Sequence, residues 1–428
     1  MHTPTTDLAI DDIHLGSTDI LLRPDRDAIF AKLRDERPVS FHAEMYPIGY
    51  DESNSMLPLG PGFWALTRHE DVMKVSRDAD NFRSAPSTNI LDIPAEIAEW
   101  LGSMINMDSP KHTRMRLIVN RGFTPRRVAQ IEENVRTQAR DIVRRVAPLG
   151  HCDFVSEIAA ALPLGIICDM MGIPREDHHR IYELTNIILG VGDPEYAATI
   201  EKLMAAGMEL FQYGLALAES RLSHPTDDIA SSLVNAEIPD ENGELHSLTP
   251  SELGSFFLLL VAAGNETTRN AISHGMRALT DHPEQRALLM NDFENVAPTA
   301  VEEIVRWATP VIHFRRTALA DAEVGGQLIK AGDKVVMFYN SANRDERKFA
   351  DPYTFDVTRS PNEHVGFGAG GPHFCLGANL ARREITVMFD ELLHALPDIH
   401  ISGDADMLQS GFIHGIKRMP AEWTPRTL

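Results

Sequence analysis

The sequence predicts a mainly α-helical fold with a smaller β portion. Seven stretches carry apolar residues three and four positions apart, the spacing that puts them on one face of a helix: 128–147, 154–171, 178–190, 200–222, 249–280, 298–308 and 376–395. Two short segments, 63–67 and 334–339, are rich in aromatic and aliphatic residues and are bounded by turn residues, as strands are. We expect the β portion around residues 36–68 and 311–340 and helices in the remainder.

The composition is that of one large globular unit. The chain has 428 residues, of which 43% are hydrophobic and 24% charged, so it can bury a core that encloses a sizeable cofactor. No Pro-, Gly- or Ser-rich linker divides it. We therefore expect residues 1–428 to form a single domain.

Charge and cysteine content exclude several classes of protein. The formal net charge of −22 argues against nucleic-acid binding, since phosphate contacts need an excess of Lys and Arg. The N-terminus lacks the basic start and apolar run of a signal peptide, and the longest apolar run, 256–263, is too short to span a bilayer, so no membrane anchor is expected. The three cysteines form no C-x-x-C pair, which fits a reducing cytoplasm and neither a disulfide framework nor a zinc site.

The first chemical pattern lies in a helix that is expected to open at Ser109-Pro110. His112 and Arg116 are four residues apart, on one face of this helix. Together they can grip an anionic group.

The longest predicted helix begins at Thr249, where Pro250 and Glu252 complete a capping box. Residues 256–263 are apolar all round, which places this helix through the middle of the protein. A polar break, 263–268, then interrupts it with a glycine that costs about 1 kcal/mol relative to alanine.

Two interpretations of this break stay open. A threonine hydroxyl can bond a carbonyl one turn back and bend the helix. Alternatively, the missing side chain at Gly264 makes room for a ligand, and Thr267 and Glu266 supply a proton path.

Two arginines and a glutamate form a weaker pattern. Glu303 and Arg306 are one helical turn apart, and Arg359 follows downstream. On a surface such a pair means little.

A glycine-rich loop, 367–377, delivers Cys375 to the start of an amphipathic helix. Backbone N–H groups and the positive end of a helix dipole favour a thiolate, the form that binds a soft metal. Glycines let a backbone approach a flat cofactor closely. The alternative is an inert buried cysteine.

These four patterns, in this order, resemble the cytochrome P450 family over about residues 100–380. The resemblance implies a triangular prism-like α/β haem protein with one catalytic domain and haem b as cofactor. It implies that the sulfur of Cys375 is the axial ligand of the haem iron. It further implies a distal haem face at Ala263, Gly264, Glu266 and Thr267, and a buried structural triad of Glu303, Arg306 and Arg359.

The resemblance also implies the remaining cofactor contacts. The family's donors to the two haem carboxylates correspond here to His112, Arg116, Arg316 and His373. Phe367 and Gly377 complete the expected cofactor-binding set. The spacing from Phe367 to Cys375 is one residue longer than in the family, so we expect an enlarged loop.

A narrower resemblance concerns the substrate. The segments 167–174, 262–270 and 412–417 look like those of mycobacterial P450s that hydroxylate the terminal (omega) carbon of methyl-branched lipids or isoprenoids, with steroid side-chain hydroxylases as near relatives. The apolar segment 89–107 stands where the family has its loop over the distal face, and such a cover suits a hydrophobic substrate. The candidate pocket residues, which ordinary core packing explains equally well, are Asn89, Ile90, Met104, Ile105, Val311 and Phe412.

The family's reaction converts RH, O2, two electrons and two protons to ROH and water. Thr267 is expected to hold dioxygen and a water, and Glu266 to relay protons. No flavin or iron–sulfur motif occurs, so a ferredoxin with an NAD(P)H-dependent ferredoxin reductase is expected to supply the electrons. A basic patch for this acidic partner, or else a set of scattered solvated charges, is formed by Lys111, Arg114, Arg121, Arg126, Arg127, Arg382 and Arg383.

Two other classes remain open at this point. A haem protein that binds or senses ligands without turnover needs the cysteine loop but not the pair Glu266-Thr267, whose presence favours the enzyme. A haem-free helical scaffold needs neither.

Overall fold

The structure is a computed structural model that describes residues 4–45, 59–121, 125–197, 199–239, 243 and 245–428. Of residues 121, 125–130, 238–239 and 246 only the backbone is described.

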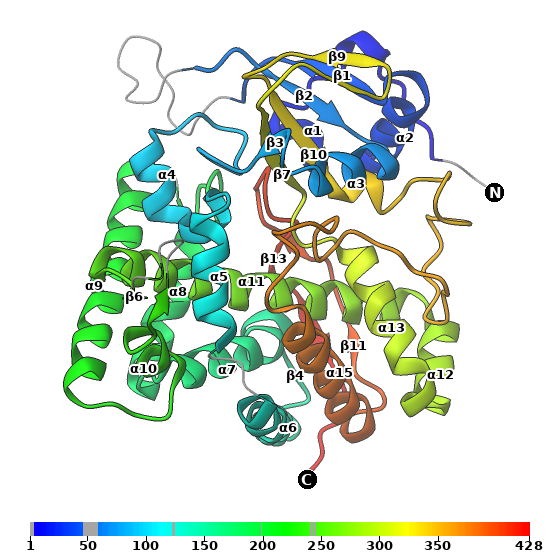
Figure 1. The fold of residues 1–428 in the computed structure, drawn as a ribbon. Helices are drawn as coiled ribbons and strands as arrows, with labels where there is room; N and C mark the ends of the chain where they lie inside the picture. Colours follow the sequence, from blue (N-terminus) through cyan, green and yellow to red (C-terminus); the bar gives the residue numbers. More distant parts are fainter. Residues whose placement is uncertain (1–3, 46–58, 122–124, 198, 240–242, 244) are drawn as a thin grey trace.

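Helices dominate the described part of the chain, as the sequence predicts (Figure 1). The α-helices are α1 (Thr18–Leu22), α2 (Arg26–Glu36), α3 (His69–Arg77), α4 (Ala95–Gly102), α5 (Lys111–Arg121), α6 (Pro125–Val146), α7 (Ala161–Met171), α8 (His178–Leu189), α9 (Ile200–Ser223), α10 (Ile229–Val234), α11 (Pro250–Asp281), α12 (Pro283–Asn291), α13 (Phe293–Ala308), α14 (Tyr339–Ala342) and α15 (Ala378–Ala395). Each of the seven predicted stretches coincides with helix, although a π-helical turn, Val155–Ala159, precedes α7.

Helix α13 differs most from its predicted bounds. It begins at Phe293, five residues before the predicted start, and contains Pro298 inside it. A proline inside a helix removes one backbone hydrogen bond, and here the helix continues through it. The predicted start at residue 298 was therefore five residues too late.

The main sheet has five strands in the order β1 (Val39–His42), β2 (Phe63–Leu66), β10 (Lys334–Phe338), β7 (His313–Ala318) and β3 (Phe82–Arg83). Strand β10 is parallel to β2 and antiparallel to β7, and the register pairs Val335 with Arg316. Both predicted strands belong to this sheet, at the top of Figure 1.

The expectation of helices throughout the remainder was wrong in detail. Small sheets also form from β4 (His151–Asp153), β11 (His400–Ile401) and β14 (Pro420–Glu422), from β5 (Ile238–Pro239) and β6 (Leu245–His246), and from β12 (Asp406–Met407) and β13 (Ile416–Arg418). A further pair, β8 (Ala322–Val324) and β9 (Gln327–Ile329), lies within the predicted β range. Strands of two or three residues are too short for their alternation to be recognised in sequence.

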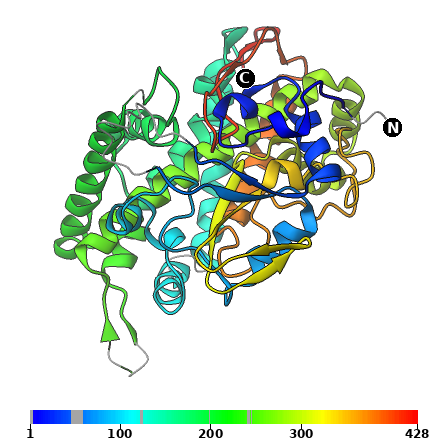
Figure 2. The same cartoon turned by 90° about the horizontal axis from the view of Figure 1, so that it is seen from above.

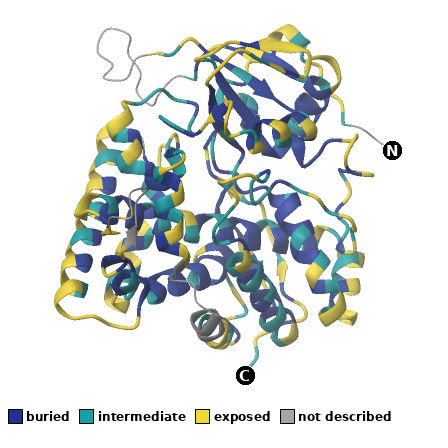
Figure 3. Ribbon diagram, viewed as in Figure 1, coloured by how far each residue is buried: buried dark blue, intermediate teal, exposed yellow. Residues whose placement is uncertain are grey.

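Helix α11 runs through the centre of the helical part (Figures 1 and 2). The predicted capping box is confirmed: the Glu252 N–H donates to the Thr249 hydroxyl at 3.2 Å, and the Glu252 carboxylate accepts from the Thr249 N–H at 2.9 Å. Side chains along α11 are largely buried (Figure 3), against α7, α8, α9, α13 and α15. No described helix combines the length and apolar character needed to cross a bilayer.

Candidate functional site

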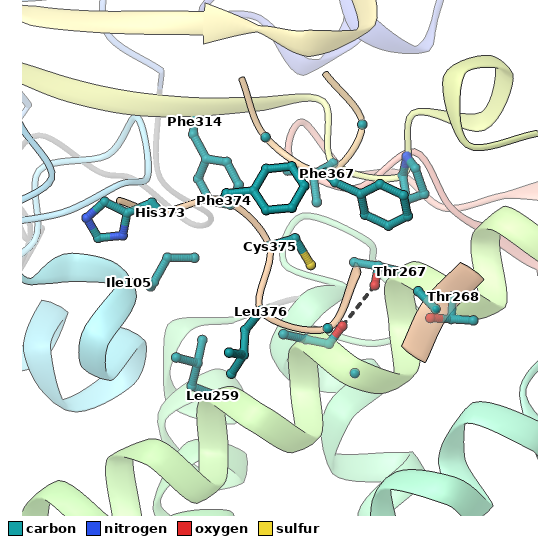
Figure 4. A pocket seen from close by; sticks show the side chains of 18 of the residues that line it. Ile105, Leu259, Thr267, Thr268, Phe314, Phe367, His373, Phe374, Cys375 and Leu376 are labelled. Atoms are coloured by element: carbon teal, nitrogen blue, oxygen red, sulfur yellow. Dashed lines mark hydrogen bonds between the residues drawn. The ribbon is translucent and has the colours of Figure 1, made fainter. Parts of the chain in front are cut away.

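A cavity lies between α11, the cysteine loop, α15, α5 and strand β7 (Figure 4). Cys375 comes from the loop before α15, while Thr267 and Thr268 come from α11. Elements far apart in sequence therefore enclose one space.

The cysteine loop accommodates its additional residue with three left-handed glycines. Gly368, Gly370 and Gly371 have φ of 90°, 82° and 80°, a region that other residues rarely adopt. The Cys375 N–H donates to the Phe367 carbonyl at 2.9 Å, so the longer loop still closes between these two residues. Both line the cavity, as does Gly377.

Two opposing effects act on the Cys375 thiol. Burial raises its pKa, while the Gly377 N–H and the positive charges of Arg116 and Arg382 lower it to a smaller extent. The expected backbone donor is therefore present, but it does not outweigh burial. A metal ion bound to the sulfur would favour the thiolate.

Four nitrogen-bearing side chains meet at one end of the cavity: His112, Arg116, Arg316 and His373. The rings of His112 and His373 are 4.1 Å apart between centroids, and Nε2 of each is buried without a hydrogen-bond partner. Burial and the neighbouring positive groups lower the pKa of both imidazoles, that of His373 to about 2.

This end of the cavity fits an anionic ligand. The negative charge of Asp108 acts on both His112 and Arg316. The Asp108 carboxylate, however, already accepts hydrogen bonds from the N–H groups of Ser84 and Ala85, at 2.8 and 2.9 Å. Buried polar atoms without partners are costly, and a neighbouring anion favours the protonated imidazole, in which both ring nitrogens donate. The two orphaned imidazole nitrogens and two arginines therefore fit the two carboxylates of the haem implied by the resemblance, with the Cys375 sulfur as a soft ligand for its iron.

The polar break leaves α11 continuous. The Thr267 hydroxyl donates to the Ala263 carbonyl one turn back, at 2.9 Å, and both residues line the cavity with Gly264. A Cβ added at Gly264 would lie 3.3 Å from the side chain of Ile167 in α7. The missing side chain at Gly264 thus lets Ile167 of α7 pack closely against α11 beside the cavity.

Glu266 does not line the cavity. It is 1% exposed and forms an ion pair with Arg269 in the next turn, and it accepts from Asn270 Nδ2 at 3.1 Å. Arg269 in turn donates to Asn186 Oδ1 at 2.7 Å. The two residues expected to act together therefore lie on different sides of α11.

The three residues of the predicted triad are in contact. Arg306 Nε and Nη2 both donate to the Glu303 carboxylate at 2.7 Å, and Arg359 Nε donates to it at 3.1 Å. Glu303 and Arg306 are fully buried. The triad joins α13 to the segment that leads to the cysteine loop.

Half of the candidate pocket residues line the cavity. Met104, Ile105 and Val311 do. Asn89 does not, Ile90 packs in the core beside the main sheet, and Phe412 packs edge-on against the cavity residue Phe314, with 5.6 Å between ring centroids. Sequence reasoning could not separate these two layers, because both are apolar.

Several lining residues escaped the sequence reasoning, above all Glu384 of α15. This carboxyl group is buried, and burial raises its pKa to about 8 although Thr268 hydrogen-bonds it. The sequence did carry a signal for this residue. Glu384 lies three positions after Ala381, on the apolar face of the helix predicted over 376–395, where a charged side chain is unexpected. The other lining residues that were missed include Phe256, Leu259, Leu260, Thr268 and Phe314.

The predicted basic patch is largely neutralised. Lys111 pairs with Glu99 at 2.6 Å, Arg114 with Glu252 at 2.9 Å and Arg382 with Glu302 at 2.5 Å, and Arg383 pairs with Glu132. The side chains of Arg121, Arg126 and Arg127 lie outside the described residues. For the four described side chains, local pairing with acidic residues favours the alternative of scattered charges over a free basic patch.

Comparisons with known proteins agree on one family. The family model described as cytochrome P450 matches residues 194–397. The methyl-branched lipid omega-hydroxylase of Mycobacterium tuberculosis (strain ATCC 25618 / H37Rv) is 51% identical over 427 residues, covering 99% of this chain and 97% of its own length.

Two further matches are more distant. The steroid C26-monooxygenase of Rhodococcus jostii is 43% identical over 92% of this chain and 81% of its own length. The solved structure of a Mycobacterium marinum cytochrome P450 in complex with pseudoionone has a TM-score of 0.89 at 43% identity, covering 98% of this chain and 100% of its own.

Proposed function

The chain belongs to the cytochrome P450 family, and from this membership we propose that it hydroxylates the terminal carbon of a methyl-branched lipid or isoprenoid. Its family makes it a monooxygenase that binds haem b. Thiolate-bound haem supplies the oxygen chemistry. The side chains around the haem would bind it, orient the substrate and supply protons.

We assign the haem contacts from the cavity. The Cys375 sulfur would bind the haem iron, and His112, Arg116, Arg316 and His373 would bind the two carboxylates. Phe367 and Gly377 of the cysteine loop, and Ala263 and Gly264 of α11, line the same cavity and would contact the haem there. The orphaned imidazole nitrogens support this assignment.

The observation that carries the substrate proposal is the 51% identity, across nearly the whole of both chains, to methyl-branched lipid omega-hydroxylases. The cavity supports the same proposal because part of its lining is apolar. The apolar lining residues include Ile105, Leu259, Leu260, Val311 and Phe314. An apolar lining offers a hydrocarbon no polar partner, so a chain must be oriented by shape alone.

Thr267 is proposed to hold a water molecule beside the reacting oxygen. Its hydroxyl hydrogen is directed to the Ala263 carbonyl, so its lone pairs are available to accept a hydrogen bond within the cavity. Glu266 is proposed to pass protons toward Thr267 from the opposite side of α11, which requires its ion pair with Arg269 to loosen. Glu384, beside Thr268, is a second group that can hold a proton at neutral pH.

The electrons are proposed to come from a ferredoxin with an NAD(P)H-dependent reductase. A surface hollow beside the cysteine loop, the proximal hollow, is lined by Lys74, Arg77 and Met73, and by Gly368 and Phe374, which also line the cavity. Its other charged lining residues are Glu70 and the ion pair of Lys348 with Glu363. Lys74 and Arg77 are exposed, and Phe374 is 39% exposed. A donor in this hollow lies one loop away from Cys375, which supports docking there rather than at the neutralised patch. A cytoplasmic location stays a prediction.

Steroid side-chain hydroxylation is the second candidate, because relatives with that activity in their names are 41–43% identical to the chain. An apolar cavity suits a sterol tail as well as a lipid.

A substrate panel tests the proposal with the haem-loaded protein. The reduced carbon monoxide complex is recorded first, to establish thiolate ligation. Branched and linear fatty acids, isoprenoids and a sterol ketone are then ranked by the spectral shift on binding, and the products are analysed by mass spectrometry with a ferredoxin, its reductase and NADH. We expect terminal hydroxylation, faster on branched than on linear chains. Preferential turnover of the sterol ketone would favour the second candidate.

A further inference from the structure

The cavity is covered by residues 84–108, here called the cover segment, which contribute Met104 and Ile105 to its lining. The two ends of this segment are clamped together. Asp108 accepts from the N–H groups of Ser84 and Ala85, and Asn106 Oδ1 accepts from the N–H and hydroxyl of Thr88 at 2.9 and 2.8 Å. The base of the segment is therefore fixed.

Beyond Thr88 the segment is held to the main sheet by side chains. The last backbone bond to the sheet runs from the Arg315 N–H of β7 to the Thr88 carbonyl, at 2.8 Å. Four residues later the Asp92 carboxylate accepts from Arg315 Nη1 at 2.7 Å and from Lys334 Nζ of β10 at 3.0 Å. The same cations also donate to backbone carbonyls just before Asp92: Arg315 Nη1 to those of residues 89–91 at 3.4–3.5 Å, and Lys334 Nζ to that of Ile90 at 3.4 Å. Asp92 supplies the shortest of these bonds between the cover and the two adjacent strands.

The two cations are buried, with Arg315 4% and Lys334 3% exposed, while Asp92 is 31% exposed. Lys334 also pairs with Glu44, which lies outside the cover segment. The four side chains form a neutral cluster of two cations and two anions. Loss of the Asp92 charge leaves one positive charge uncompensated in the sheet. It also removes the ion pairs between the cover and the sheet, so that only the longer bonds to the carbonyls of residues 89–91 remain between these groups.

The other side of the cover is attached differently. Trp100 of α4 packs edge-on against Phe211 of α9, with 5.7 Å between ring centroids. On the Asp92 side, Ile90 is fully buried in the core beside the sheet, whereas Asp92, two residues later, is 31% exposed. The part of the cover that can open on this side therefore begins at Asp92, beyond the buried anchor at Ile90.

We propose that Asp92 is a positioning residue for substrate admission: its ion pairs with Arg315 and Lys334 hold the cover segment closed over the cavity. The proposal rests on the proposed function in one respect, that the cavity admits a hydrophobic molecule. Substrate enters and leaves when Asp92 separates from the sheet.

Stopped-flow binding of 1-dodecylimidazole to the haem-loaded full chain tests this, at a pH where the probe is neutral. We expect D92N to raise both the association and the dissociation rate about fivefold, the effect of losing a partly exposed ion pair, with Kd within about twofold of the wild type because both rates change together. D92E keeps the charge and should restore slow rates.

The matched control is E99Q, which breaks the exposed pair between Glu99 and Lys111 within the same segment. It should leave both rates unchanged. Amide hydrogen exchange at residues 89–105 should be faster in D92N than in E99Q, a readout that does not depend on activity.

If D92N fails to take up haem, the double variant D92N/R315Q keeps the cluster neutral and should bind the probe with fast rates. Wild-type rates and wild-type exchange in the variant that folds would overturn the proposal. A chain that shows the expected rates but hydroxylates no lipid would instead contradict the proposed function, so the two failures are distinguishable.

Discussion

At the scale of single residues, Thr267 has the most direct proposed role in the reaction. T267A removes the only oxygen of that side chain but no contact with the proposed haem ligands, so haem and substrate binding should persist. We expect product formed per NADH to fall about tenfold or more, with electrons recovered as hydrogen peroxide, because a positioned proton donor or acceptor contributes at least that much. Parallel assays of NADH, peroxide and product check this. T267S should retain most of the coupling, and normal coupling in T267A would contradict the role.

Glu384 gives a second residue-scale prediction, on stability and pH. Its pKa is about 8 in the folded protein against an ordinary value of 4.5, so the folded state binds the extra proton. Its contribution to the free energy of unfolding is fully present below pH 4.5. This contribution is lost as pH rises through 8, by up to about 1.4 kcal/mol per pH unit.

E384Q cannot ionise, so its stability should fall less than that of the wild type between pH 5 and 8. Thermal midpoints of the haem-loaded proteins, measured across this range, check the difference. E391Q, in the same helix at a group paired with Arg136, is the matched control and should preserve the wild-type slope. Parallel curves for E384Q and the wild type would show that Glu384 does not titrate in this way.

At the scale of elements, the Glu303 carboxylate joins α13 to the segment before the cysteine loop. It accepts from Arg306, Arg359, the Asn362 side chain and the Asp356 N–H. E303Q leaves a buried guanidinium unpaired, which costs about 3–5 kcal/mol. We expect poor haem retention and a lower denaturation midpoint, measured by Soret absorbance during heating.

The control for E303Q is D281N, which removes the exposed pair of Asp281 with Arg277 at 3.6 Å. Its midpoint should stay close to that of the wild type, since exposed pairs contribute little. Equal midpoints for E303Q and D281N would mean that the triad is not needed to hold these elements together.

At the scale of the whole molecule, the net charge is strongly negative, and yet an acidic electron donor is expected. The proximal hollow offers local positive charge at Lys74 and Arg77 beside the cysteine loop. We expect K74E/R77E to raise the KM for ferredoxin about tenfold at low ionic strength, with kcat little changed, because rim charges act mainly on association.

Steady-state NADH oxidation at varied ferredoxin concentration checks this prediction. R383E is the matched control, since Arg383 belongs to the patch expected from the sequence but pairs with Glu132. A larger effect of R383E than of K74E/R77E would favour the original patch over the proximal hollow.

Features carried by neighbouring residues were predictable from the sequence. These features are the helical periods, the capping box of Thr249 and Glu252, and the glycine-rich loop before Cys375. Each depends on a spacing of a few residues, so the sequence predicts it without knowledge of tertiary contacts. Four strands of the five-stranded sheet also lie in the expected ranges, while β3 (Phe82–Arg83) lies outside them. The strand order pairs β2 with β10, which are separated by more than half of the chain.

The sequence by itself determined the types of group available at the site: a thiol behind glycines, two histidines and two arginines for carboxylates, and a threonine in a buried helix. Only the tertiary structure decided their surroundings. It turned Glu266 toward Arg269, buried Glu384 beside Thr268, neutralised four predicted basic residues and joined Asp92 to Arg315 and Lys334. The physical reason is that burial and charge pairing depend on which distant segments come into contact. Spacing along the sequence shows only which nearby residues share a face of one element.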